Sequence, residues 1–101
     1  MAKQNIGLIG LGVMGQNLVL NMERNGFSII GYDLDQAKLK ASEKVFERKN
    51  IIVAYSLKEF LQHLESPKKI MMMVPAGKAV DSVIHDLKPH LATGDLLIDG
   101  G

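Results

Sequence analysis

Residues 10–15, with the sequence Gly-Leu-Gly-Val-Met-Gly, restrict the possible fold of this chain more than any other segment. They follow an apolar run at 6–9 and precede a run whose apolar residues have helical spacing. A strand that enters a glycine-rich turn and then a helix is typical of a dinucleotide-binding unit. An acidic residue, Asp33, follows one expected helix and one expected strand later. The sequence therefore predicts a parallel α/β fold with a nucleotide site at this turn.

The three glycines have separate expected roles. Gly10 would make the tight turn after the strand, Gly12 would let the backbone approach a pyrophosphate, and Gly15 would let the helix pack closely on the sheet. The positive N-terminal end of the helix would then face the phosphates. The residues of this loop that we expect to bind the cofactor are Gly10, Leu11, Gly12, Val13, Met14 and Gly15.

Strand and helix patterns alternate along the whole chain. The expected strands lie at 5–9, 27–32, 51–54, 69–74 and 96–98, and the expected helices at 13–25, 35 to about 48, 56 to about 66, and 77–90. The apolar residues assigned to a common helix face are Met14, Leu18 and Met22 in the first helix, and Ala37, Ala41 and Val45 in the second. This alternation predicts a Rossmann-type, doubly wound parallel sheet with strand order 3-2-1-4-5, truncated after the fifth strand.

Asp33 lies at the expected end of the second strand, close to the usual distance of about 20 residues for a ribose-binding acid. The alternative is that Asp33 or Asp35 caps the following helix. We assign the ribose to Asp33 and the cap to Asp35. The 2′-phosphate of NADP would add a like charge, worth about 4 kcal/mol at 4 Å and an effective dielectric of 20, before solvent screening. Because Leu34 and Asp35 follow and no arginine does, the sequence favours NAD over NADP.

The fourth strand leads into Val74, Pro75 and Ala76. This turn would border the crevice where the strand order reverses, so we expect all three residues to contact the cofactor. The alternative is an ordinary strand-to-helix turn whose backbone is fixed by Pro75.

Composition excludes several other classes of protein. A length of 101 residues with 47% hydrophobic content fits one domain, and a net charge of +1 with no basic tract argues against nucleic acid. The absence of cysteine excludes disulfides and thiolate metal sites. No signal peptide or membrane span is indicated, so we expect a soluble, cytoplasmic protein. The three histidines, His63, His85 and His90, lack metal-ligand spacing and are assigned no role.

The segments 6–22, 74–77 and 97–101 together resemble the N-terminal part of 6-phosphogluconate dehydrogenases. The resemblance implies an enzyme of the pentose phosphate pathway that oxidises 6-phosphogluconate at C3 and decarboxylates it to ribulose 5-phosphate. It also implies that Gly100 and Gly101 begin a turn beside nicotinamide and substrate. The catalytic lysine and glutamate of the family lie beyond Gly101, so no residue here is assigned as catalytic. The whole protein is expected to be a homodimer.

Two positions depart from the family pattern. NADP-dependent members carry Asn-Arg-Thr where this chain has Asp33, Leu34 and Asp35, which supports NAD. Many members have lysine in place of Pro75, so a contact there would come from the backbone. We interpret residues 1–101 as a dinucleotide-binding domain of a longer enzyme, expected to bind cofactor without turnover. A stand-alone NAD-sensing module and an NAD-dependent 3-hydroxyacid dehydrogenase are the alternatives.

Overall fold

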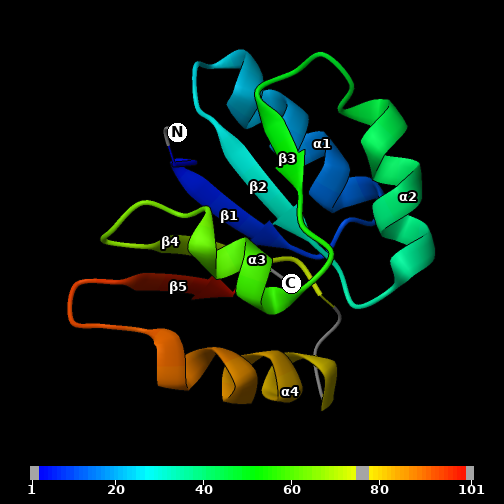
Figure 1. Cartoon of the computed structure of the whole chain (residues 1–101). Coiled ribbons are helices and arrows are strands. Elements are labelled where there is room, and N and C mark those ends of the chain that lie inside the picture. The colour runs from blue at the N-terminus through cyan, green and yellow to red at the C-terminus, as the bar shows by residue number, and fades with distance from the viewer. Residues whose placement is uncertain (1–2, 75–77, 100–101) are drawn as a thin grey trace.

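The computed structural model describes residues 3–74 and 78–99. Strands and helices alternate from end to end (Figure 1). The elements in chain order are β1 (Ile6–Ile9), α1 (Val13–Arg24), β2 (Ile29–Tyr32), α2 (Gln36–Val45), β3 (Ile51–Val53), α3 (Leu57–Gln62), β4 (Lys69–Met72), α4 (Lys78–Leu87), the short 3₁₀ helix η1 (Lys88–His90) and β5 (Leu96–Asp99).

The five strands form one parallel sheet in the order β3-β2-β1-β4-β5, which confirms the predicted topology. Central strand β1 pairs with β2 on one side, where Ile9 lies opposite Tyr32, and with β4 on the other, where Ile9 lies opposite Met72. The carboxyl ends of these three strands therefore meet at one edge of the sheet. The chain order reverses there, because β2 and β3 extend to one side of β1 and β4 and β5 to the other.

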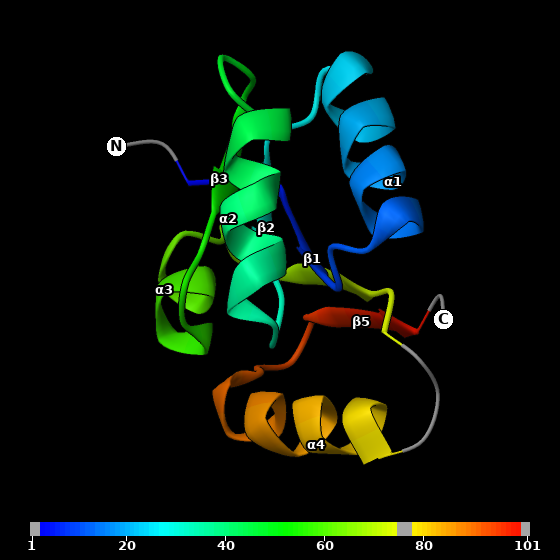
Figure 2. The ribbon, with the colours of Figure 1, turned by 90° about the vertical axis from the view of Figure 1, so that its right-hand side faces the viewer.

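Two hydrophobic layers cover the two faces of the sheet. Because side chains alternate along a strand, Leu8 packs into one layer and its neighbour Ile9 into the other. The first layer contains Val19 from α1 and Leu39 from α2, whereas the second contains Phe60 from α3. Figure 2 shows α1 and α3 on opposite sides of the sheet. A parallel sheet buried on both faces explains why the strand sequences read as unbroken apolar runs.

The apolar face predicted for α2 is wrong. Ala37, Ala41 and Val45 are exposed, and the buried side chains of this segment are Leu39, Ser42 and the helix-ending Phe46. Leu39 and Phe46 also have helical spacing, and they bury more apolar area than the two alanines, so packing favours this rotation of the helix. In α1 the predicted face is confirmed in part: Leu18 and Met22 pack against the layer of Val19, whereas Met14 is exposed.

Side-chain caps begin α2 and α3, and the cap predicted for Asp35 is confirmed. The Asp35 carboxylate accepts a hydrogen bond from the Ala37 backbone N–H at 2.9 Å, which begins α2. The Ser56 hydroxyl accepts from the Glu59 N–H at 3.1 Å, and the Glu59 carboxylate accepts from the Tyr55 N–H at 2.8 Å. Ser56 and Glu59 therefore form a capping box, whose return bond goes to the residue before the cap.

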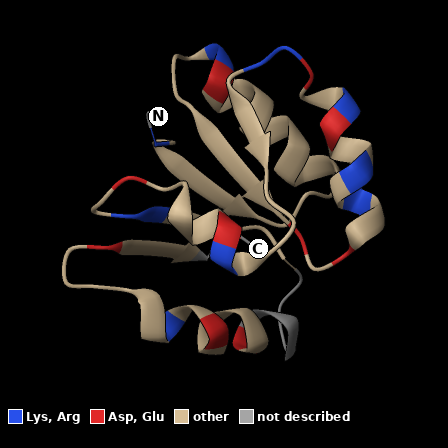
Figure 3. Ribbon diagram, in the orientation of Figure 1, with Lys and Arg blue, Asp and Glu red and all other residues tan. Residues whose placement is uncertain are grey.

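Most charged residues lie on the helices and connections (Figure 3). Strands β1, β2 and β3 carry none, whereas β4 begins at Lys69 and β5 ends at Asp99. Both signs are mixed along α2, which carries lysine and glutamate. Within the described part of the chain, no helix has the length and apolarity needed to cross a bilayer.

The Asp95 carboxylate joins the turn before β5 to the start of β4. It accepts hydrogen bonds from the backbone N–H groups of Lys68 at 2.7 Å and Ala92 at 2.8 Å. These bonds, that of Ala92 first, lower the pKa of Asp95 from its ordinary value of 3.8. A carboxyl group with a lowered folded pKa stabilises the fold above its unfolded pKa, and this contribution is lost as the pH falls through the folded pKa.

We therefore expect Asp95→Asn to melt below the parent chain at pH 7, because its amide nitrogen cannot accept the second hydrogen bond. The difference in melting temperature should begin to shrink as the pH falls below about 4, where the unfolded chain binds a proton at this carboxyl group, and it should vanish below the lowered pKa of the folded state. Thermal unfolding followed by circular dichroism between pH 7 and about 3 measures this. A difference that is constant with pH would contradict the assignment.

Candidate functional site

A hollow of about 360 Å³ lies where the carboxyl ends of β1, β2 and β4 meet. In open α/β sheets, ligands bind in the crevice at this reversal of strand order. The described residues that line the hollow are Gly10, Gly12, Val13, Met14, Gly15, Asp33, Leu34, Lys38, Met73 and Val74. The structure thus brings together residues from the glycine loop, the end of β2, α2 and the end of β4.

The glycine loop (residues 10–15) owes its shape to the absence of side chains at two positions. Gly10 has φ of +108°, and a Cβ atom there would lie 2.5 Å from the Met73 carbonyl oxygen. A Cβ atom on Gly15 would overlap the carbonyl oxygen of Gly10. The contrast is Gly12, where a Cβ atom would have no neighbour within 4 Å and would enter open space. Gly10 and Gly15 are therefore needed for folding, whereas Gly12 leaves room for a ligand.

The N-terminal end of α1 opens onto this space. Its cap residue is Gly12, which supplies no side-chain hydrogen bond, and the first turn contains no acidic residue. The first intrahelical bond runs from the Gln16 N–H to the Gly12 carbonyl at 2.9 Å. The N–H groups at the start of a helix have no intrahelical acceptor, and the helix dipole adds positive potential. An anionic group such as a pyrophosphate can accept hydrogen bonds from them.

Asp33 closes the other end of the hollow, with only 7% of its surface exposed. One carboxylate oxygen accepts from the Leu11 N–H at 2.7 Å and the other from the Asp35 N–H at 2.8 Å. The carboxylate therefore ties the glycine loop to the end of β2. A carboxylate has about four acceptor positions, so two remain for hydroxyl groups of a ligand. This geometry fits the ribose role predicted for Asp33.

Leu11 takes part through its backbone alone. Its side chain is fully buried in the layer beneath α1, and its N–H is held by Asp33. Gly31 on β2 makes room for it, because a Cβ atom there would lie 3.1 Å from the Leu11 side chain. The Leu11 carbonyl accepts from the Gln16 side-chain amide at 3.1 Å. Gln16 therefore supports the loop from α1, a role that nothing in the sequence pattern indicated.

Large apolar side chains surround the hollow and face solvent. Val13 is 77% exposed, Met14 72% and Leu34 54%, and all three line the hollow. Exposed apolar groups that gather around a concave site are typical of a surface that a ligand covers. Leu34, next to Asp33, is suitably placed to contact an adenine ring.

Asp33 sits beside a phenol that stays neutral at physiological pH. Burial raises the pKa of Tyr32 above its ordinary value of 10.0, and the carboxylates of Asp33 and Asp86 raise it further. Among the described lining residues, the charged side chains at this end of the hollow are therefore Asp33 and Lys38.

The predicted site residues fall into three groups. The lining of the hollow includes Gly10, Gly12, Val13, Met14, Gly15, Asp33, Leu34 and Val74. Leu11 and Asp35 do not line it, because one side chain is in the core and the other caps α2. Outside the described residues lie Pro75, Ala76, Gly100 and Gly101. Lys38 and Met73 also line the hollow and were not predicted from the sequence. Only the short distance in sequence between Asp33 and Lys38 could have indicated Lys38.

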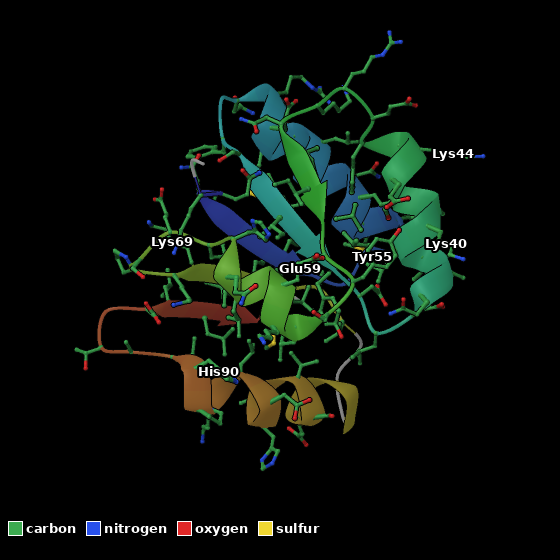
Figure 4. All side chains as sticks on the ribbon, in the orientation of Figure 1. Lys40, Lys44, Tyr55, Glu59, Lys69 and His90 are labelled. Carbon is green, nitrogen blue, oxygen red and sulfur yellow. The ribbon has the colours of Figure 1, made fainter. Side chains whose placement is uncertain are left out.

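A second hollow of about 570 Å³ lies away from the glycine loop and is lined by residues of α3, the residue before β4 and η1. Its lining includes Leu57, Leu61, Lys68 and His90, and Figure 4 shows His90 at the lower end of the molecule, below the sheet. It contains neither a glycine turn nor a long helix N-terminus, so it does not fit a dinucleotide. Across residues 3–74 and 78–99, no group of three or more histidine, aspartate or glutamate side chains could hold a metal ion.

Comparison with known proteins gives a consistent family. A family model described as the NAD binding domain of 6-phosphogluconate dehydrogenase matches residues 5–101. The chain is 50% identical over 101 residues to the NADP(+)-dependent, decarboxylating 6-phosphogluconate dehydrogenase of Bacillus subtilis. It is 52% identical over 103 residues to the decarboxylating 6-phosphogluconate dehydrogenase of Synechococcus elongatus. In both cases all of this chain matches 22% of the relative.

A solved structure agrees with these sequence matches. The 6-phosphogluconate dehydrogenase of Plasmodium falciparum superposes with a TM-score of 0.86 at 37% sequence identity. The match covers 96% of this chain and 21% of that one. That protein has been solved in its apo form, with NADP+ and with 6-phosphogluconate. The chain thus spans about a fifth of the length of the relatives that it matches.

Proposed function

Since the chain belongs to the family of NAD-binding domains of 6-phosphogluconate dehydrogenase, we propose that the hollow at the glycine loop binds a nicotinamide dinucleotide. The observation that carries this proposal is the difference between Gly12, which faces open space, and Gly10 and Gly15, which face protein backbone. A ligand that approaches the backbone at the middle position explains why a side chain is absent there too. The family supports binding of a nicotinamide dinucleotide in general, either NAD or NADP.

The residues present fit such a cofactor from end to end. The N–H groups at the start of α1 would hold the pyrophosphate, and the remaining acceptor positions of Asp33 would hold the adenosine ribose. The exposed side chain of Leu34 would cover the adenine, and Met73 and Val74 border the side of the hollow formed by β4. Val13 and Met14 would exclude water from above the phosphates.

We further infer that NAD is preferred to NADP. The Asp33 carboxylate is buried and held by two backbone N–H groups, so it cannot turn away from a 2′-phosphate. Two like charges 4 Å apart repel by about 4 kcal/mol at an effective dielectric of 20. Solvent screening reduces this value, but about 1.4 kcal/mol already corresponds to a tenfold preference.

Asp33→Asn is expected to raise the ratio of NADP to NAD affinity at least about tenfold, because the substitution removes the charge and keeps one acceptor oxygen. Isothermal titration of each nucleotide measures the ratio. The matched control is Asp35→Asn, which removes a charge two residues from Asp33. The Asp35 side chain caps α2 and does not line the hollow. We expect the control to change the ratio by less than about threefold. Tighter NADP than NAD binding by the parent chain would contradict the preference.

For the whole protein, we propose oxidation of 6-phosphogluconate and its decarboxylation to ribulose 5-phosphate, with the nicotinamide as hydride acceptor. The described residues supply cofactor binding, and none of the three histidines lines the hollow. This chain alone should therefore bind cofactor without turnover. Formation of NADH and CO2 by the whole protein on addition of 6-phosphogluconate tests the reaction and separates it from nucleotide sensing and from 3-hydroxyacid oxidation. The domain bounds 1–101, the substrate contacts at Gly100 and Gly101, and a homodimer remain predictions.

A further inference from the structure

Lys38 is the one basic side chain among the described residues that line the dinucleotide hollow. It lies in the first turn of α2, where its N–H donates to the carbonyl of the cap residue Asp35 at 3.1 Å. The same end of the hollow is lined by Asp33 and Leu34. Lys38 therefore shares the ribose end of the site with the buried carboxylate.

The two nearby carboxylates already have partners. Asp33 accepts two backbone hydrogen bonds, and Asp35 accepts one from the Ala37 N–H. Lys38 is exposed and its ammonium carries three donors on a flexible stem, so it can move towards an anion that enters the hollow. The N-terminal end of α2 adds positive potential at the same place.

We infer that Lys38 is a specificity-determining residue, whose ammonium partly offsets the repulsion between Asp33 and the 2′-phosphate of NADP. This inference rests on the proposed function of the hollow. NADP would meet one fixed negative charge and one mobile positive charge at the ribose, whereas NAD has a hydroxyl group there and needs neither. Asp33 thus sets the direction of the preference, and Lys38 limits its size.

Lys38→Gln should weaken NADP binding about tenfold and NAD binding by no more than about twofold, since only NADP carries the extra phosphate. Isothermal titration of the chain with each nucleotide in about 50 mM NaCl measures both constants. In about 500 mM NaCl the difference in NADP affinity between parent and variant should shrink, because salt screens the attraction between the exposed Lys38 ammonium and the 2′-phosphate. Lys38→Arg, which keeps the charge, should have a ratio of NADP to NAD affinity within about twofold of the parent value.

Lys40→Gln is the matched control, because this lysine lies on the same helix and is absent from the lining of the hollow. Figure 4 shows Lys40 and Lys44 on the outer side of α2. The control should leave both affinities unchanged. An equal loss for both nucleotides in Lys38→Gln, an unchanged ratio, or the same shift in the control would overturn the inference while nucleotide binding itself persists. Failure of the parent chain to bind either nucleotide would instead refute the proposed function and this inference with it.

Discussion

Replacing Gly12 with alanine is expected to remove most dinucleotide affinity while leaving the domain folded. The backbone of Gly12, with φ of −71° and ψ of −172°, is allowed for alanine. The new methyl group would meet no protein atom within 4 Å, but it would occupy the space through which a pyrophosphate approaches the helix N-terminus. Loss of the phosphate hydrogen bonds should weaken binding at least about fiftyfold, or over 2 kcal/mol.

Titration calorimetry and thermal unfolding of Gly12→Ala together test this expectation. The melting temperature should stay within a few degrees of the parent value, which places the effect in the ligand site. Gly26→Ala is a suitable control for the loss of a glycine. Gly26 lies two residues after the end of α1, has φ of +98°, and would offer open space to a Cβ atom. That control should lose about 1 kcal/mol of stability and no affinity. Unchanged nucleotide affinity in Gly12→Ala would contradict the role assigned to Gly12.

The same substitution three residues later should act on folding instead. An alanine Cβ at position 15 would overlap the Gly10 carbonyl oxygen, which is backbone and cannot rotate away, and it would also approach Leu8. Either α1 must move off the sheet or the glycine loop must change shape. We expect a loss of about 3 kcal/mol or more in the free energy of unfolding. For a domain of this size, that corresponds to a fall of roughly 12 °C or more in melting temperature.

Urea unfolding of Gly15→Ala measures this loss, with Gly12→Ala as the matched control in the same loop. The two variants carry the same chemical change, so a difference in stability between them reports the surroundings of each Cβ. If Gly15→Ala unfolded within about 1 kcal/mol of the parent, the close packing of α1 on the Gly10 carbonyl would be contradicted.

The fold could be predicted from the sequence because its signals are local and agree with one another. Apolar runs separated by amphipathic segments indicate parallel strands and crossover helices, and the glycine loop identifies which strand is central. The caps at Asp35 and Ser56 were also predictable, because a cap depends on side chains within three residues of the helix start. Strand order then followed from the known topology of such folds, and the sheet confirms it.

Features that depend on tertiary packing were not predictable in the same way. Two faces of α2 have helical spacing, and only packing against the sheet selects Leu39 and Phe46 over the alanines. The sequence could not show that the Leu11 side chain turns into the core, since this depends on the space left by Gly31 on the neighbouring strand. Lys38 enters the site because α2 begins directly beside the end of β2, and it reads in the sequence as one more solvated charge.

The central claim is that a dinucleotide binds at the glycine loop, and a titration of the isotope-labelled chain with NAD, followed by amide NMR spectra, tests it most directly. The account predicts saturable shifts at the amides of Gly12, Val13 and Gly15, and at Leu34 near the ribose. The amides of Leu57 and Leu61, which line the other hollow, should not shift. Shifts confined to that second hollow, or no shifts at millimolar NAD, would contradict the account.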